Sequence, residues 1–390
     1  MQTQKNINLT KRIFIILIMT LLITTLIIPK NHILVSANFE NDIKHKSSVL
    51  IDLNSNKILH ETNCEEKLPI ASVTKLMTVL LTLEEIENKQ IDLTDKVVVS
   101  DNASGMGGSQ IFLDSNCEYE IGQLLKSVIV ASANDSSVAL AEHIAGSEQN
   151  FVKMMNEKAF SLGLKNTNYA NCTGLPSADG YSSAFDQAIV LKQVLSYELY
   201  HEYSAIWLED FVHPSGRITQ MTNTNKLSRH YEGCIGGKTG STNQAKYCLA
   251  VGAEKNDTKL IAVVLGAENS KDRFKLASDL LNYGFTNFES KLILSNADLL
   301  NKTIKIKGTK HSISLKAEQN FSISVNKNEP LNYTLNFHLP STLNSVMENE
   351  VVGNVEIAID GIVIKTINIL SSETYLEPTI FDYLKQIINT

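Results

Sequence analysis

A serine and a lysine stand three residues apart at the start of a long apolar run. In the segment PIASVTKLMTVLL, Ser72 and Lys75 would share one face of a helix, because side chains at i and i+3 are neighbours there. A serine hydroxyl becomes a good nucleophile only when a base removes its proton. Lys75 can be that base only if its pKa falls well below the ordinary value of about 10.4. Burial and a second nearby cation would both lower it.

Two further short motifs could complete such a site. Ser132 and Asn134, in the triplet SAN, follow a helical run and would lie in a polar turn at a cleft. Lys238, Thr239 and Gly240 form the triplet KTG on an expected strand. Lys238 would be the second cation, and Gly240 would let a substrate backbone approach the strand closely. Each motif alone is weak, but the ordered set S-x-x-K, S-x-N, K-T-G is typical of class A β-lactamases and penicillin-binding proteins.

The chain resembles one of these groups over most of its length. It is similar to the low-molecular-mass penicillin-binding proteins, the serine-type D-alanyl-D-alanine carboxypeptidases. The resemblance runs from about residue 45 to the C-terminus, and it includes ASVTKLMT, GGSQIFL, ASANDSSVALAEHIAG, FVKMMNEKAFSLGLKNTNYAN, GLPSADGYSSAFDQA, TNTNKL, GGKTGST and KYCLAVGA.

The resemblance implies a role for each motif residue. Ser72 would attack the carbonyl carbon of the penultimate D-alanine of a peptidoglycan stem peptide, and Lys75 would accept the hydroxyl proton. Ser132 would relay a proton between the two lysines and the leaving amine. Asn134 would bind the substrate amide and help to position Lys75. Lys238 would lower the pKa of Lys75 and attract the terminal carboxylate of the D-Ala-D-Ala end.

The end of the KTG strand would bind substrate as well. The resemblance implies that Thr239, Gly240 and Thr242 line the substrate site. The backbone N–H groups of Ser72 and Ser241 would form an oxyanion hole, typically worth about 3 to 4 kcal/mol per donor. Water would release the shortened peptide, whereas β-lactams would remain on the serine as slowly hydrolysed acyl-enzymes. No cofactor and no metal is expected.

Three positions qualify the resemblance. Ser241 stands where many relatives carry His or another bulky residue, which affects substrate preference but leaves a backbone donor in place. Cys172 occupies a position where Pro is common, which could alter the loop that follows. Asp186, within SSAFDQA, is interpreted as a structural group that holds a loop, rather than as a proton-transfer group.

Other functions fit the sequence less well. A class A β-lactamase needs a glutamate on the loop after S-x-N to activate water, and residues 166–180 contain none. A non-catalytic cell-wall-binding protein would not need three intact motifs. A metalloenzyme is disfavoured because the nine histidines form neither H-E-x-x-H nor H-x-x-E-H.

The order of strand and helix patterns along residues 38–285 predicts an α+β domain, in which an antiparallel sheet packs against helices. This domain must position the motif residues. Residues 47–63 predict a hairpin, and residues 232–267 predict three successive strands. A helix buried on nearly all sides should begin near Ser72. Further helices are expected at 121–135, 136–146, 148–163 and 272–284, and glycines should end the second and third of these four.

Two other segments follow this domain. Alternating apolar and polar residues over 286–375 predict a small all-β domain. Residues 376–390 predict an amphipathic helix that binds a membrane surface, with docking on the chain's own β-domain as the alternative.

The N-terminus and the composition bear on the setting of the protein. Residues 1–37 have basic residues, a 16-residue apolar run and the small-residue exit Val-Ser-Ala, which indicates a cleaved secretory signal peptide; a retained anchor is the alternative. We therefore expect an exported protein at the outer face of the cytoplasmic membrane or in the cell wall. A net charge of −7 disfavours nucleic acid as a partner. Five cysteines cannot all pair, although Cys234 and Cys248 flank a probable hairpin and could form a bridge.

Overall fold

The computed structural model describes residues 39–296 and 300–377. Its first folded part contains a five-stranded antiparallel sheet in the order β2-β1-β9-β8-β7. The predicted hairpin and the three predicted successive strands are confirmed, and they supply all five strands of this sheet. Their bounds are β1 (Ser47–Asp52), β2 (Ile58–Thr62), β7 (Cys234–Thr242), β8 (Lys246–Lys255) and β9 (Thr258–Ala267). β7 lies at the edge of the sheet, so the backbone groups along its outer side are not paired with another strand of this sheet.

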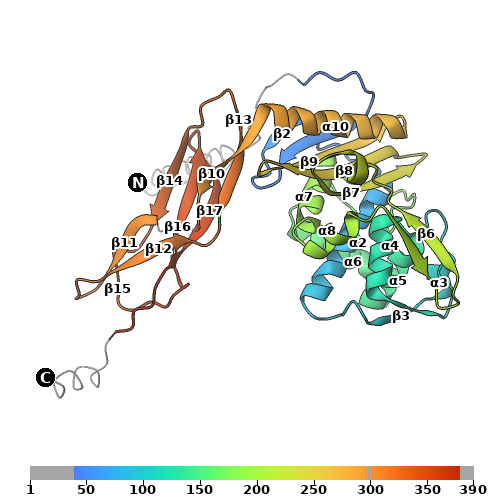
Figure 1. The fold of residues 1–390 in the computed structure, drawn as a ribbon, viewed down its shortest axis with the longest axis horizontal. Coiled ribbons are helices and arrows are strands. Elements are labelled where there is room, and N and C mark those ends of the chain that lie inside the picture. The colour runs from blue at the N-terminus through green and yellow to red at the C-terminus, as the bar shows by residue number, and fades with distance from the viewer. Residues whose placement is uncertain (1–38, 297–299, 378–390) are drawn as a thin grey trace, which may run out of the picture. The chain divides into compact units, whose positions relative to one another are not determined.

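Both faces of this sheet are buried, and successive side chains of each strand point to opposite faces. On β9, Ile261 and Val263 belong to one apolar cluster, whereas Ala262 and Val264 belong to a second cluster with Leu276 of α10. Figure 1 shows α10 on one side of the sheet and the other large helices on the opposite side. These helices are α2 (Lys75–Glu87), α4 (Ile121–Val130), α5 (Asn134–Ala145), α6 (Glu148–Ser161), α7 (Ala184–Val194), α8 (Glu198–Ser204) and α10 (Ser270–Asn287).

The helix at the first motif begins differently from its prediction. Residues Ala71–Thr74 form a 3-10 turn, η1, and the α-helix α2 begins at Lys75. Every residue of α2 from Lys75 to Leu83 is buried, which confirms the prediction of a helix enclosed on nearly all sides. Ala71, immediately before Ser72, has a φ of 48°, which lies in the left-handed region.

The predicted helical run from residue 121 that ends in a polar turn at Ser132 is confirmed, but the next helix begins at Asn134, two residues before its predicted start. α4 ends at Val130 and α5 begins at Asn134, because Ser132 adopts a φ of 62° that no α-helix can continue through. The predicted glycine stops are confirmed: Gly146 caps α5 with a φ of 74°, and Gly163 follows α6 with a φ of 72°.

Short elements complete this part of the molecule. Two small two-stranded antiparallel sheets pair β3 with β4 and β5 with β6, and two single-turn helices connect larger elements. They are β3 (Lys96–Val98), β4 (Glu118–Glu120), β5 (Leu208–Val212), β6 (Ile218–Thr222), α3 (Asp101–Ser104) and α9 (Leu227–His230).

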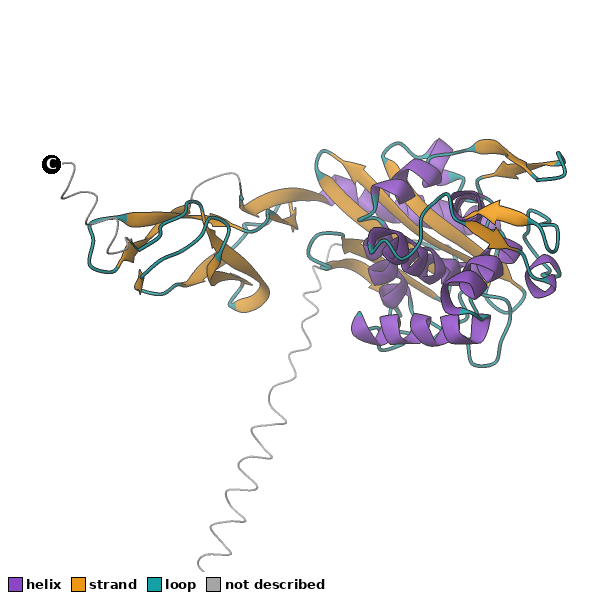
Figure 2. Cartoon of the chain, turned by 90° about the horizontal axis from the view of Figure 1, so that it is seen from below, coloured by secondary structure: helices purple, strands orange, loops and turns teal. Residues whose placement is uncertain are grey.

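The second folded part follows α10 and has its own apolar core. Within residues 288–296 and 300–377, Figure 2 draws only strands and loops, which confirms the all-β prediction. β10 pairs with β13, and a six-stranded sheet has the order β14-β16-β17-β12-β11-β15. The bounds are β10 (Phe288–Leu294), β11 (Leu300–Ile306), β12 (Ser312–Ala317), β13 (Phe321–Asn326), β14 (Tyr333–His338), β15 (Thr342–Leu343), β16 (Val351–Ile359) and β17 (Ile362–Ser371).

Cys234 and Cys248 do not form the bridge that the sequence left possible, because all five cysteines are free thiols. The register of the hairpin explains this result: Cys234 lies opposite Ala253, whereas Cys248 lies opposite Gly240. The two thiols are therefore separated along the paired strands.

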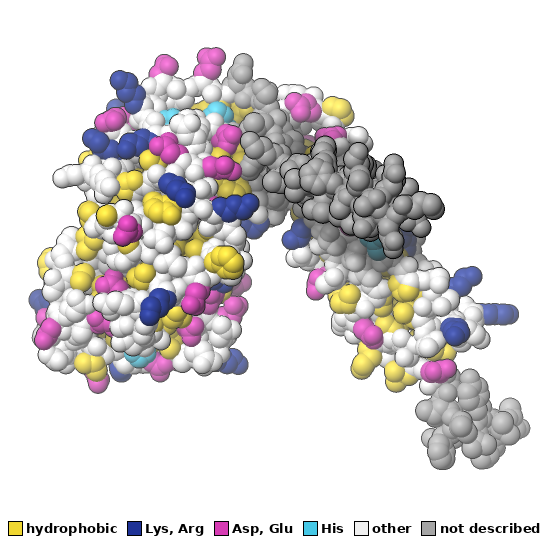
Figure 3. Space-filling model, turned by 180° about the vertical axis from the view of Figure 1, so that it is seen from behind, with side chains coloured by type: hydrophobic (Ala, Val, Ile, Leu, Met, Phe, Trp, Pro, Cys, Tyr) yellow, Lys and Arg dark blue, Asp and Glu magenta, His cyan; other side chains and the backbone are white. Residues whose placement is uncertain are grey.

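Two terminal predictions lie outside the described residues. The predicted signal peptide covers residues 1–37, and nearly all of the predicted C-terminal helix lies beyond residue 377. Across the described parts of the chain, no helix has both the length and the apolar character needed to span a membrane. On the face drawn in Figure 3, acidic and basic side chains are interspersed.

Candidate active site

Ser72 and Lys75 lie close enough for proton transfer. Lys75 Nζ is 3.1 Å from Ser72 Oγ, because one turn of η1 and α2 separates the two residues. The ammonium also donates a 2.6 Å hydrogen bond to the backbone carbonyl of Thr173. Lys75 is fully buried, whereas Ser72 is partly exposed and open to a substrate.

Burial changes the acid–base chemistry of Lys75. Desolvation lowers the pKa of Lys75 to about 7, and the Cys172 thiol and the Asp135 carboxylate only partly oppose it. A large share of the protein therefore carries a neutral amine at position 75 near neutral pH. This is the protonation state that a general base toward Ser72 requires.

The second serine is held by the second lysine. Ser132 Oγ accepts a 2.7 Å hydrogen bond from Lys238 Nζ, which also donates to the carbonyl of Thr239 at 3.0 Å. Burial lowers the pKa of Lys238 well below its ordinary value, and the positive charges of Lys75 and Arg273 lower it further. The prediction that Lys238 lowers the pKa of Lys75 does not match these causes: burial alone lowers the pKa of Lys75, and the charge of Lys75 instead lowers the pKa of Lys238.

Asn134 is fixed by the loop that precedes α4. Its backbone N–H donates to the carbonyl of Ser109 at 2.7 Å, and its Nδ2 donates to the carbonyl of Gly107 at 2.7 Å. Its buried Oδ1 has no hydrogen-bond partner among the described residues. A buried acceptor without a partner is costly, so this atom is suited to receive an N–H group from a bound substrate.

The edge strand β7 approaches the backbone of Ser72 at a glycine. A Cβ atom on Gly240 would lie 2.5 Å from the carbonyl oxygen of Ile70 and 3.0 Å from the backbone nitrogen of Ser72. Only glycine permits this approach, which brings the backbone beside Ser241 close to the Ser72 N–H group. Thr239 is buried, and Thr242 is half-buried at the end of the strand.

The sequence analysis missed a third cation at this site. Arg273 of α10 is only 8% exposed, and its Nη1 donates to the carbonyls of Gly240 at 2.9 Å and Cys248 at 3.2 Å. It shares a helix face with Leu276 and Leu280, which are fully buried. A charged residue within the apolar stripe of an otherwise ordinary helix was the signal that could have found it.

Two residues that qualified the resemblance have structural contacts. Asp186 Oδ2 accepts hydrogen bonds from the Asn166 backbone at 2.8 Å and from Thr167 Oγ1 at 2.7 Å, as expected of a group that holds a loop. The carbonyl of Cys172 accepts a 2.7 Å hydrogen bond from Thr78 Oγ1. This contact ties to α2 the loop whose next carbonyl holds Lys75.

No metal site accompanies these residues. Within residues 39–296 and 300–377, no group of three His, Cys, Asp or Glu side chains is placed to hold a metal ion. The arrangement can instead supply a serine nucleophile, a neutral amine, a second amine–serine pair and several donors for an anion.

Comparisons with known proteins agree with this chemistry. Residues 34–269 match the family described as D-alanyl-D-alanine carboxypeptidase, and residues 288–377 match the C-terminal domain of penicillin-binding protein 5. The chain is 40% identical to the D-alanyl-D-alanine carboxypeptidase DacF of Bacillus subtilis over 74% of each chain. It is 32% identical to DacA of Haemophilus influenzae over 88% of each chain. The crystal structure of penicillin-binding protein 5 from Haemophilus influenzae has a TM-score of 0.72 and 31% identity, covering 87% of this chain and 99% of that one.

Proposed function

Because the chain belongs to the D-alanyl-D-alanine carboxypeptidase family, we propose that it removes the terminal D-alanine from peptidoglycan stem peptides through an acyl-enzyme on Ser72. The observation that carries this proposal is the buried Lys75 amine, with a pKa near 7, placed 3.1 Å from Ser72 Oγ. A base of this pKa is matched to proton abstraction at neutral pH.

The first half of the reaction forms the acyl-enzyme. Neutral Lys75 accepts the hydroxyl proton as Ser72 Oγ attacks the carbonyl carbon of the penultimate D-alanine. Negative charge develops on the carbonyl oxygen, where the backbone N–H groups of Ser72 and Ser241 stabilise it. The Asn134 side chain, whose Oδ1 is without a partner, binds a substrate amide.

The leaving D-alanine departs through the second pair of groups. Its nitrogen receives, through Ser132, the proton that Lys75 took from Ser72, so Lys75 becomes neutral again; Ser132 Oγ is already hydrogen-bonded to Lys238 Nζ. Its carboxylate binds where Lys238, Thr239 and Arg273 concentrate positive charge and donors, and Thr242 lies at the same end of β7. A water molecule then hydrolyses the ester and frees Ser72. A β-lactam acylates the same serine, and slow hydrolysis of that ester accounts for penicillin binding.

The setting proposed for this reaction is outside the cytoplasm. Support comes from the sequence of residues 1–37, which has the three regions of a secretory signal peptide. The amphipathic pattern of residues 376–390 supports peripheral attachment to the outer face of the membrane. Fractionation of cells after removal of residues 376–390 tests this attachment: the protein should move from the membrane fraction to the soluble fraction.

The central experiment replaces the nucleophile. Ser72→Ala should abolish both covalent labelling by a fluorescent penicillin and release of D-alanine from a pentapeptide ending in D-Ala-D-Ala. Ser161→Ala, a change at an exposed serine of α6, should leave both activities intact and serves as the matched control. Labelling that persists in the Ser72→Ala protein would place the nucleophile elsewhere.

A further inference from the structure

The carbonyl group of Thr173 orients the amine of Lys75. A neutral amine accepts the hydroxyl proton of Ser72 when its lone pair points toward Ser72 Oγ, so its N–H bonds must point elsewhere. The Thr173 carbonyl oxygen accepts one of them, at 2.6 Å from Lys75 Nζ. Among the described residues, this oxygen and Ser72 Oγ are the hydrogen-bond partners of Lys75 Nζ. The position of the carbonyl therefore sets the direction of the lone pair.

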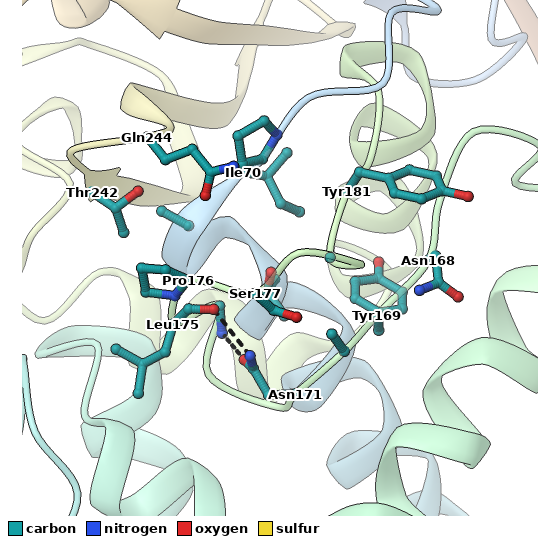
Figure 4. Close-up of a pocket in the computed structure, with 16 residues that line it drawn as sticks. Ile70, Asn168, Tyr169, Asn171, Leu175, Pro176, Ser177, Tyr181, Thr242 and Gln244 are labelled. Atoms are coloured by element: carbon teal, nitrogen blue, oxygen red, sulfur yellow. Dashed lines mark hydrogen bonds between the residues drawn. The ribbon is translucent and has the colours of Figure 1, made fainter.

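The segment that carries this carbonyl belongs to no helix or strand, so side chains must hold it. Asn171 holds it from within, because its Oδ1 accepts the backbone N–H groups of Thr173 at 3.2 Å and Gly174 at 2.6 Å. Its Nδ2 donates to the carbonyl of Leu175 at 3.0 Å. Figure 4 shows the Asn171 side chain with dashed lines for its hydrogen bonds to the residues that follow it. These contacts shape the segment but do not fix it to the helices around it.

Two contacts at Cys172 fix the segment to neighbouring helices. Thr78 Oγ1 of α2 donates to the Cys172 carbonyl at 2.7 Å. On the other side, Glu148 Oε1, from the first residue of α6, accepts the Cys172 backbone N–H at 3.1 Å and the Cys172 thiol at 3.3 Å. Burial and the Glu148 carboxylate raise the pKa of this thiol, so it stays protonated and can donate. Glu148 therefore holds two donors of the residue that precedes Thr173.

The contact depends on the residue type at position 172. Cysteine supplies a backbone N–H and a thiol, whereas a proline, which the family commonly carries at this position, would supply neither. Hydrogen bonds that involve an ionised group are roughly twice as strong as neutral ones. Because Cys172 is fully buried, no water would replace the carboxylate at its N–H group. The loss of the Glu148 side chain would therefore leave a buried donor unpaired and free the segment to shift.

We propose that Glu148 is a positioning residue for acylation, which acts through Cys172 on the direction of the Lys75 amine. The described contacts of its carboxylate include neither Ser72 nor Lys75, so it is not a catalytic residue. A shift of about 1 Å in the Thr173 carbonyl would turn the lone pair of the amine away from the hydroxyl, and a misplacement of that size can cost roughly 100-fold in rate. This inference rests on the proposed function.

The test is stopped-flow acylation of the full chain by a fluorescent penicillin over a range of concentrations. This measurement separates the dissociation constant of the first complex from the limiting rate constant of acylation. Glu148→Ala should lower the limiting rate constant by at least about tenfold and change the dissociation constant by less than about twofold. Glu148→Gln keeps an acceptor oxygen for the Cys172 N–H and should keep the rate constant within about threefold of the wild-type value. Glu157→Ala removes the same charge from an exposed position of α6 and should leave both constants unchanged.

Three results would overturn the inference and leave the proposed function intact. One is a Glu148→Ala protein that is acylated at the wild-type rate. Another is a Glu148→Ala protein that loses affinity for penicillin without a slower limiting step. The third is a Glu148→Gln protein as slow as Glu148→Ala. Failure of the wild-type protein to be acylated at all would overturn both.

A second background tests the route through Cys172. Cys172→Pro removes both donors that Glu148 holds, and the family's common use of proline at this position shows that the fold accepts it. In that background, Glu148→Ala should change the limiting rate constant by less than about twofold, because the two changes remove the same contact. A further loss as large as that in the wild-type background would show that Glu148 acts through another contact, contrary to the proposal.

Discussion

The lowered pKa of Lys75 predicts how penicillin acylation depends on pH. With a pKa of about 7, roughly a tenth of the protein carries a neutral amine at pH 6 and roughly nine tenths at pH 8. If the neutral amine abstracts the proton of Ser72, the second-order rate constant for acylation should rise about tenfold across this range and then level off. A lysine with its ordinary pKa of 10.5 would instead give a rate still rising at pH 9.

The measurement is the stopped-flow rate of labelling by a fluorescent penicillin at a series of pH values. The matched control is Lys75→Arg, because a guanidinium group keeps its charge in this range. Its acylation rate should fall by at least about 100-fold at every pH. A flat profile in the wild-type protein, or a Lys75→Arg variant that retains the pH dependence, would refute the assignment of Lys75 as the base.

Three further predictions concern stability and packing. Since the pKa of Lys75 is about 7 in the folded state and 10.5 ordinarily, the folded protein binds fewer protons between these values, and its free energy of unfolding should rise with pH there; Lys75→Met should remove that contribution in urea titrations. Gly240→Ala should reduce acylation by at least about 100-fold with little change in circular dichroism, because the methyl group would lie 2.5 Å from the Ile70 oxygen, whereas Gly107→Ala, which meets nothing within 4 Å, should stay active. Dithiothreitol should leave the melting temperature unchanged within about 1 °C, because every cysteine is free; a clear drop would reveal a disulfide.

Part of the site could be read from residue types and local spacing. Ser72 and Lys75 are one turn apart, so their proximity depends only on local backbone geometry, and the 3-10 turn preserves it. The hairpin, the successive strands, the buried α2 and the all-β segment also follow from local patterns of apolar residues. The polar turn at Ser132 was also predicted, but its left-handed φ of 62° carries no signal in the identity of a serine.

Other features depend on contacts between residues distant in the sequence. Lys238 meets Ser132 across 106 positions, and Arg273 of α10 reaches the carbonyl of Gly240 across 33. The pKa of Lys75 depends on how completely the surrounding segments exclude water, and no spacing rule gives that quantity. The amino-acid sequence by itself therefore determined which nucleophile and which amines are available. Only the tertiary structure decided which serine each amine contacts and how far burial lowers each pKa, because these properties arise from packing between distant segments.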